Sequence, residues 1–389
     1  MTRLIEVLIS LAIVAALFVI VGFMLPSHRH IEQSVETNRK MTIVYDTLNS
    51  FARFQQWNVL PLRDPAMDIK ISGPKSGPGA QLDFSSKERS VGSGSWKLVD
   101  SVPGKSVTYE ITNKEPGTNK VSTFKLEPTG RGSVKRNVRI TQTYDVDYGM
   151  NLFGRYAGMY VASGMGDSMK MSLGRLSNLL AAVPNFDYTE LSKDDPSKAP
   201  SVVERPAANL LLVSTAVERN NDVVERTMKN NMQWIEKVMK ANNLEADGPV
   251  RVITNEFGSD TYSFDLAQPV RKKSGAADAK PDAKDTAATS VEETEADKVA
   301  DADQAPAPAG KLSIKLEGPV EHVYEESAQV AVVPFSGHMA NLPKVRDALR
   351  AWVLTQGMET AGRPYEAWDA GIENGFIDKG EFRVYWMLR

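Results

Sequence analysis

The chain has 389 residues, of which 42% are hydrophobic and 24% are charged, which is enough for about two or three domains with cores of their own. A formal net charge of −3 leaves no broad basic surface of the kind that neutralises phosphates, so no nucleic-acid partner is expected. The chain contains no cysteine, which excludes disulfides, thiolate metal sites and cysteine nucleophiles.

An apolar run stands near the start of the sequence. Residues 7–25, VLISLAIVAALFVIVGFML, carry no charge and, extended to residue 4, can cross a hydrocarbon core of about 30 Å. A cleaved secretory signal is the alternative, but this run exceeds the usual apolar length of about 7 to 15 residues and no small-residue cleavage site follows it. We predict a transmembrane anchor at residues 1–27, with residues 4–25 in the lipid bilayer.

The charges that flank the anchor bear on its orientation. Arg3 precedes the apolar run, whereas Arg29, Arg39 and Lys40 follow it among acidic residues that offset them. The comparison favours an amino terminus in the cytoplasm. The prediction is a single-pass protein of a bacterial-type inner membrane, with its soluble domains on the non-cytoplasmic side.

The next region has the pattern of one strand, short helices, an antiparallel meander and a long helix. HIEQSVETN alternates as a strand does, and MTIVYDTLNSFARFQQWN has apolar residues at helical spacings. Short alternating runs separated by turn clusters fill residues 68–146, and a Met- and Gly-rich amphipathic helix is predicted over 152–183. This order predicts a curved sheet that grips a helix and leaves a cavity between them.

ETNRKMTIVYDTLNSFARFQQWN, GSGSWKLVD and the terminal helix resemble the START-like, or SRPBCC, superfamily, which includes the polyketide cyclases. The resemblance implies a helix-grip domain over residues 28–187 with an apolar ligand cavity, and it does not imply a reaction. Five methionines are candidates for the lining because thioethers adapt to irregular apolar partners, with ordinary core packing as the alternative: Met150, Met159, Met165, Met169 and Met171. Trp57 and Trp96 are expected in the core.

The long predicted helix contains several glycines. Gly158, Gly164, Gly166 and Gly174 each weaken a helix by roughly 1 kcal/mol relative to alanine. We therefore expect this helix to be bent or mobile.

A Pro-, Ser- and charge-rich linker at residues 188–202 leads to a segment that occurs twice. Each copy is a strand, a helix and two strands, which makes a βαββ unit. The first copy is predicted at 208–217, 221–242, 249–256 and 260–267, and the second at 328–335, 342–356, 363–370 and 380–388. Pairing two such units about a pseudo-twofold axis buries their apolar faces or leaves a groove between them.

VAVVPFSGH, RPYEAW and GEFRVYWML resemble the GyrI-like domain, the effector-binding domain of multidrug-sensing transcription regulators. The resemblance implies a duplicated βαββ domain over residues 203–389 that binds a small molecule, so the whole chain is expected in the α+β class. No helix-turn-helix precedes this region, which removes the usual role in transcription. Between the copies, residues 272–310 are rich in Ala, Asp, Pro and Glu without aromatics, and we predict a disordered acidic insertion there.

The GyrI-like resemblance also implies a groove with aromatic walls, often with a glutamate that meets a cationic ligand. The candidate ligand-binding residues are Phe335, Tyr365, Glu366, Trp368, Glu381, Arg383, Tyr385 and Trp386. Because side chains alternate along a strand, Tyr365 and Trp368 cannot both face one groove without a bulge. One of them is expected to be packing.

Relatives commonly carry an acidic residue in the last strand where this chain has Arg383, with Glu381 on the same face. This departure counts against cation binding and against glutamate-dependent hydrolysis. The alternative role is a solvated Glu381–Arg383 ion pair worth under about 1 kcal/mol. No catalytic residue is assigned, and the four histidines have no metal-ligand spacing, so no metal or cofactor is proposed.

The leading prediction is a membrane-tethered binding protein for small hydrophobic or amphipathic molecules, acting in sensing, sequestration or delivery. One alternative is an enzyme acting on a hydrophobic small molecule, of cyclase type in the first domain or hydrolase type in the second. Another is an adaptor that binds protein partners, with the acidic insertion as the docking element.

Overall fold

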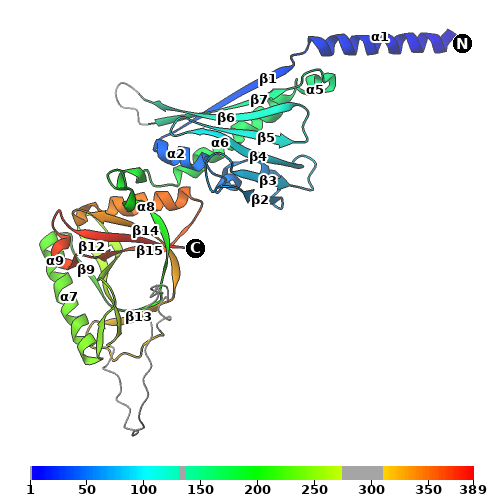
Figure 1. Ribbon diagram of the computed structural model, residues 1–389. Helices are drawn as coiled ribbons and strands as arrows, with labels where there is room; N and C mark the ends of the chain where they lie inside the picture. The colour runs from blue at the N-terminus through cyan, green and yellow to red at the C-terminus, as the bar shows by residue number, and fades with distance from the viewer. Residues whose placement is uncertain (1, 131–136, 274–309) are drawn as a thin grey trace, which may run out of the picture. The chain divides into compact units, whose positions relative to one another are not determined.

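The computed structural model describes residues 2–130, 137–273 and 310–389, and their contacts divide them into two compact units (Figure 1). The first unit takes the chain up to Pro200 together with Lys344–Thr360. The second takes Ser201–Pro343 and Ala361–Arg389. Each unit has its own antiparallel sheet.

Helix α1, Thr2–Met24, is the apolar run predicted from the sequence. Its stretch Arg3–Met24 has a mean hydropathy of 3.0, and its large side chains are exposed along its length. It is long and apolar enough to cross a membrane by length and composition, and a signal sequence would pass the same test.

The first unit is built on a seven-stranded antiparallel sheet in the order β1-β7-β6-β5-β4-β3-β2. The meander predicted over residues 68–146 supplies six of these strands, and the early strand β1 returns to pair with β7, from His28↔Asp147 to Thr37↔Val138. The strands are β1 His28–Thr37, β2 Asp68–Ser72, β3 Gln81–Ser85, β4 Ser93–Val102, β5 Ser106–Asn113, β6 Thr118–Thr129 and β7 Asn137–Asp147.

Helices cover one face of this sheet. Three short ones follow β1, namely α2 Met41–Leu48, α3 Phe54–Trp57 and α4 Leu60–Arg63. They pack with aromatic residues of the strands, and Trp57 lies fully buried against Phe54 and Phe124 in edge-to-face contacts with ring centroids 5.2 and 5.8 Å away. Trp57 is therefore a core residue, as expected.

The long helix predicted over residues 152–183 is in fact two helices, α5 Leu152–Ala157 and α6 Val161–Ala181. The break lies at Gly158, which caps α5. A Cβ atom there would lie 2.7 Å from the ring of Tyr148, so the chain passes Tyr148 only because this residue has no side chain. The expected bend is thus an interruption of the helix between Ala157 and Val161.

The second unit has a sheet of nine strands in the order β13-β9-β12-β11-β15-β16-β14-β8, with the short β10 also paired to β12. Its strands are β8 Ser201–Arg205, β9 Ala208–Glu218, β10 Leu244–Ala246, β11 Arg251–Phe257, β12 Thr261–Lys272, β13 Glu321–Glu325, β14 Ala328–Ser336, β15 Thr360–Trp368 and β16 Glu381–Leu388. Its helices include α7 Asn221–Ala241 and the short α9 Gly371–Gly375.

The strand order of this sheet has a twofold pattern. The segment predicted as the first copy contributes β9-β12-β11, and the segment predicted as the second contributes β14-β16-β15. The two segments meet where β11 pairs with β15. The strand before each copy crosses over: β8 pairs with β14, and β13 pairs with β9. Each copy is thus completed by a strand from the other. Helix α7 packs on β9 and β12, whereas its counterpart α8, Leu342–Thr355, belongs by its contacts largely to the first unit.

The predicted disordered insertion at residues 272–310 is only partly within the described residues. Strand β12 extends to Lys272, where it pairs with Leu244 of β10, so the first residue of the prediction is in a strand. Residues 274–309 lie outside the described residues.

His28, at the start of β1, gives a testable prediction about pH. His28 Nδ1 lies 2.8 Å from Asp147 Oδ1, and this hydrogen bond raises the pKa of His28 above its ordinary value of 6.5. Because the folded pKa is raised, the pair stabilises the fold when His28 is charged, and this contribution is lost as pH rises through the folded pKa. A histidine NMR titration of the full chain should place His28 above 6.5, and Asp147→Asn should lower it. Asp100→Asn, in the exposed part of β4, should leave it unchanged.

Candidate functional site

A cavity of about 430 Å³ lies between the first sheet and helix α6. We call it the α6 cavity. Its apolar wall comes from neighbouring strands and from the helix: Phe84, Trp96, Ile111, Tyr144, Met165 and Met169. This is the cavity that the helix-grip pattern predicted.

Strand alternation and one glycine shape the strand side of this wall. Trp96 in β4 pairs in register with Ile111 in β5, so both side chains face the helix. Gly94, opposite Phe84 in the register, has no room for a side chain, because a Cβ atom there would lie 2.1 Å from Thr112 O and 2.8 Å from the Phe84 ring. Gly94 therefore lets the Phe84 ring lie across the sheet.

Two of the five candidate methionines line the cavity. Met165 and Met169 are one helical turn apart on the inner face of α6. Met150, Met159 and Met171 are 73%, 51% and 48% exposed, so the prediction was wrong for them. The break at Gly158 places Met150 and Met159 outside the gripped helix, and Met171 lies on its outer face.

Polar side chains enter the wall at a few points. Gln142 Nε2 donates to Ser122 Oγ at 3.0 Å, while Gln142 Oε1 is buried without a hydrogen-bond partner. Ser168 Oγ accepts from Arg63 Nη2 at 2.7 Å, and Ser172 Oγ accepts from the Val59 amide at 3.1 Å. An unpaired buried acceptor is costly, so a ligand donor that reached Gln142 would be favoured.

The lining also carries charged side chains, all of them exposed and so at the rim. Arg63, Arg89 and Lys114 provide three cations against the single carboxylate of Glu115. Lys114 lies over Gly92, whose φ is +68° and where a Cβ atom would lie only 2.0 Å from Lys114 Cε. The rim therefore favours a ligand whose polar end is an anion.

Two buried tyrosines, Tyr144 and Tyr148, contribute hydroxyl groups to the wall. Burial raises the pKa of Tyr144 and Tyr148 above the ordinary value of 10.0. A phenol with a raised pKa stays neutral near pH 7, so both side chains can donate hydrogen bonds into the cavity.

In the second unit, three of the eight predicted ligand-binding residues lie together. Tyr365, Arg383 and Tyr385 line a groove of about 360 Å³, which we call the tyrosine groove. The rings of Tyr365 and Tyr385 are stacked with centroids 4.7 Å apart. Burial raises the pKa of both phenols.

Two further arginines, Arg205 and Arg251, line the tyrosine groove. They could not be predicted from a local pattern because their partner, Glu325, comes from a distant strand. The Glu325 carboxylate accepts from buried Arg205 and, at 3.1 Å, from Arg251. The Arg251 guanidinium also lies 5.2 Å from the centroid of the Tyr365 ring.

The alternative prediction, an ion pair between Glu381 and Arg383, was wrong. Arg383 instead donates to both carboxylate oxygens of Asp369, at 2.9 and 2.6 Å. The reason is that the Asp369 amide bonds to the Glu381 carbonyl at 3.0 Å, which holds the end of β15 beside β16. Charge assistance from Asp369 raises the pKa of Arg383 further.

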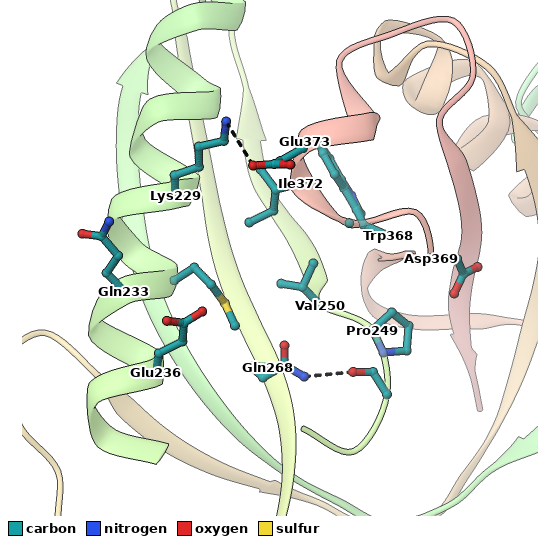
Figure 2. Close-up of a pocket in the computed structure, with 13 residues that line it drawn as sticks. Lys229, Gln233, Glu236, Pro249, Val250, Gln268, Trp368, Asp369, Ile372 and Glu373 are labelled. Atoms are coloured by element: carbon teal, nitrogen blue, oxygen red, sulfur yellow. Dashed lines mark hydrogen bonds and ion pairs between the residues drawn. The ribbon is translucent and has the colours of Figure 1, made fainter. Parts of the chain in front are cut away.

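The remaining predicted residues lie elsewhere. Trp368 is fully buried against Phe376 and Phe382 and lines a different hollow of about 410 Å³ beside α7 (Figure 2). There Lys229 lies 3.9 Å from Glu373, and Gln268 donates to the Gly248 carbonyl at 2.9 Å (Figure 2). Glu366 is fully buried, Phe335 and Trp386 are half-buried, and Glu381 is exposed. The eight residues do not form one groove, because alternation along β15 separates Tyr365 from Trp368.

Among the described residues, no group of three or more His, Asp or Glu side chains is arranged to hold a metal ion.

Residues 28–181 match the family model described as polyketide cyclase / dehydrase and lipid transport. This match confirms the polyketide cyclase-type resemblance for residues 28–181. It does not extend to the rest of the chain. No curated protein matches the sequence.

Solved structures resemble parts of the chain. A Thermobifida fusca protein solved by NMR has a TM-score of 0.30 at 17% identity, covering 39% of this chain and 93% of its own. The EcmrR C-terminal domain has a TM-score of 0.33 at 14% identity, covering 49% and 96%. Norcoclaurine synthase from Thalictrum flavum, in complex with dopamine and hydroxybenzaldehyde, has a TM-score of 0.31 at 16% identity, covering 40% and 87%. At these scores none of them carries an argument about function.

The arginines of the tyrosine groove provide a stability test. Glu325→Gln should lower the free energy of unfolding of the second unit by about 3 kcal/mol, because Arg205 is left buried without a carboxylate. Urea denaturation of the full chain, followed by hydrogen exchange of peptides from the second unit, measures it. Glu326→Gln, at the exposed neighbouring position, is the matched control. Equal unfolding midpoints in the two variants would contradict the assignment.

Proposed function

We propose that the chain is a membrane-tethered binding protein whose START-like domain holds a small hydrophobic or amphipathic molecule in the α6 cavity. The carrying observation is the cavity itself, about 430 Å³ with an aromatic and apolar wall and a rim dominated by cations. A molecule with an apolar body and an anionic end fits both parts. The lipid transport named in the description of the matching family is consistent with such a ligand.

The proposed tether is helix α1. Its 23 residues extend about 34 Å, which is enough for a bilayer core, and its apolar side chains are exposed. We propose a single-pass arrangement in a bacterial-type inner membrane, with both soluble units on the non-cytoplasmic side. Ligands that partition into the bilayer would then be concentrated beside the binding domain.

For the second unit we propose a GyrI-like effector-binding domain that arose by internal duplication. The twofold strand order supports this, since both copies arrange their strands alike around the β11–β15 pair. Its ligand would stack in the tyrosine groove on Tyr365 and Tyr385. Arg205, Arg251 and Arg383 line the groove together with Glu204 and Asp247. Glu325 and Asp369 neutralise these arginines, so a polar aromatic molecule fits the groove better than a strongly charged one.

Two glycines of α6 offer a matched test of the α6 cavity. A Cβ atom at either Gly164 or Gly174 would have no other atom within 4 Å, but only Gly164 lines the cavity. Gly164→Trp should weaken binding of dansylaminoundecanoic acid, a fluorescent amphipathic anion, by about tenfold or more. Gly174→Trp should bind it as the parent chain does.

Binding is measured on the full chain in lipid nanodiscs by energy transfer from tryptophan to the dansyl group, since Trp96 lines the cavity. Mass spectrometry of an organic extract of the purified chain should also detect a co-purified amphiphile. Equal affinity in both glycine variants, or no energy transfer in the parent chain, would count against the proposed site.

A further inference from the structure

Helix α5 is fixed to the end of the apolar helix α1. Arg155 Nη1 donates to the carbonyls of Phe23 at 3.0 Å and Leu25 at 3.2 Å, which lie at the end of α1 where carbonyls lack helical partners. The Tyr156 hydroxyl donates to the Phe18 carbonyl at 2.8 Å, and the two rings are stacked with centroids 4.5 Å apart. These contacts hold α5 level with the last two turns of α1.

The fit between the two helices depends on a glycine. A Cβ atom at Gly22 would lie 3.1 Å from Leu152 and 3.2 Å from Tyr156 as the closest neighbours, so a larger residue would press α1 away from α5. Figure 1 shows α5 at the end of the sheet where α1 leads into β1. The attachment therefore consists of specific packing and hydrogen bonds between the two helices.

The segment around α5 exposes large apolar side chains beside this attachment. Met150 is 73% exposed, Phe153 77%, Met159 51% and Tyr160 73%. Neighbouring apolar side chains so exposed mark an interaction surface. We call these four residues the α5 patch.

The same segment lines the α6 cavity. Ala157, Tyr160 and Val161 belong to its lining, and Tyr160 is at once exposed and part of the wall, which puts it at the mouth. An entrance to the cavity thus lies next to the α5 patch and level with the end of α1.

From this arrangement we propose that the α5 patch is seated in the interfacial layer of the lipid bilayer and forms the entrance through which an amphipathic lipid passes directly into the α6 cavity. The occupant is the bilayer because α1, which holds α5, is the proposed span, and aromatic side chains at such a level favour the membrane–water interface. Arg155 is compatible with this level because its buried guanidinium donates to the carbonyls of Gly149, Phe23 and Leu25, which compensate its charge. This inference rests on the proposed tether and cavity.

The depth of the patch can be measured by spin labelling, because the chain has no cysteine of its own. Met150→Cys and Phe153→Cys are labelled with a nitroxide on the full chain in vesicles of phosphatidylcholine and phosphatidylglycerol. Both labels should be more accessible to oxygen than to a water-soluble nickel complex. The control is Ile71→Cys, which is 48% exposed in β2 at the other edge of the sheet from β1 and should show the reverse.

Two results would overturn the proposed position of the α5 patch in the interfacial layer. Labels at 150 and 153 that are as open to the nickel complex as the label at 71 would place the patch in water. Labels protected from both reagents would place it against protein, which would make it a docking site for a protein partner instead.

The proposed role of the α5 patch as an entrance is tested by the rate of ligand uptake. The double variant Met150→Glu, Phe153→Glu should take up dansylaminoundecanoic acid from the vesicles about tenfold more slowly in stopped-flow, because two apolar anchors become carboxylates in the interfacial layer. The amount bound at equilibrium should not change, since neither residue lines the cavity. Ile71→Glu should match the parent chain in both measurements.

The two proposals fail in different ways. Unchanged uptake with normal equilibrium binding would overturn the entrance and leave the proposed function standing. Absence of binding in the parent chain at equilibrium would overturn the proposed function and the entrance with it.

Discussion

The structure of the first unit depends on how the side chains of one helix are distributed along its length. The carboxyl-terminal half of α6 buries Leu173, Leu176 and Leu180 against the sheet, which closes the core there. Its amino-terminal half faces the sheet with Gly166 and Ser168 beside Met165 and Met169. These residues leave the hollow that packing closes further along the helix.

The cavity and the attachment of α5 follow from one interruption in the chain. The helix is interrupted between Ala157 and Val161, where Gly158 passes close to the ring of Tyr148. Helix α5 meets α1 through Arg155 and Tyr156, and the amino-terminal part of α6 lines the cavity.

Much of the fold could be predicted from the sequence because it is set by local periodicity. Strand alternation and the 3.6-residue period located the meander, the repeated strands and the helices α7 and α8, since these patterns reflect burial on one face. The site could be predicted only in part. Asp369 meets Arg383 because β15 ends beside β16, and Glu325 meets Arg205 and Arg251 because strands distant in sequence cross between the two copies. Such partners depend on register, which no local pattern contains.

The position of the cavity mouth matters for the energetics of ligand transfer. Each buried methylene group costs about 0.8 kcal/mol to bring into water, so a chain of about ten carbons meets a barrier on the order of 8 kcal/mol when it leaves a bilayer alone. An apolar cavity in solution would not lower that barrier, because the ligand would still cross water to reach it. In the proposed arrangement, a mouth level with the end of α1 would let the apolar tail move from one apolar environment to another while its anionic end stayed near the cations of the rim. The proposed tether and the cavity would therefore do more together than either would separately.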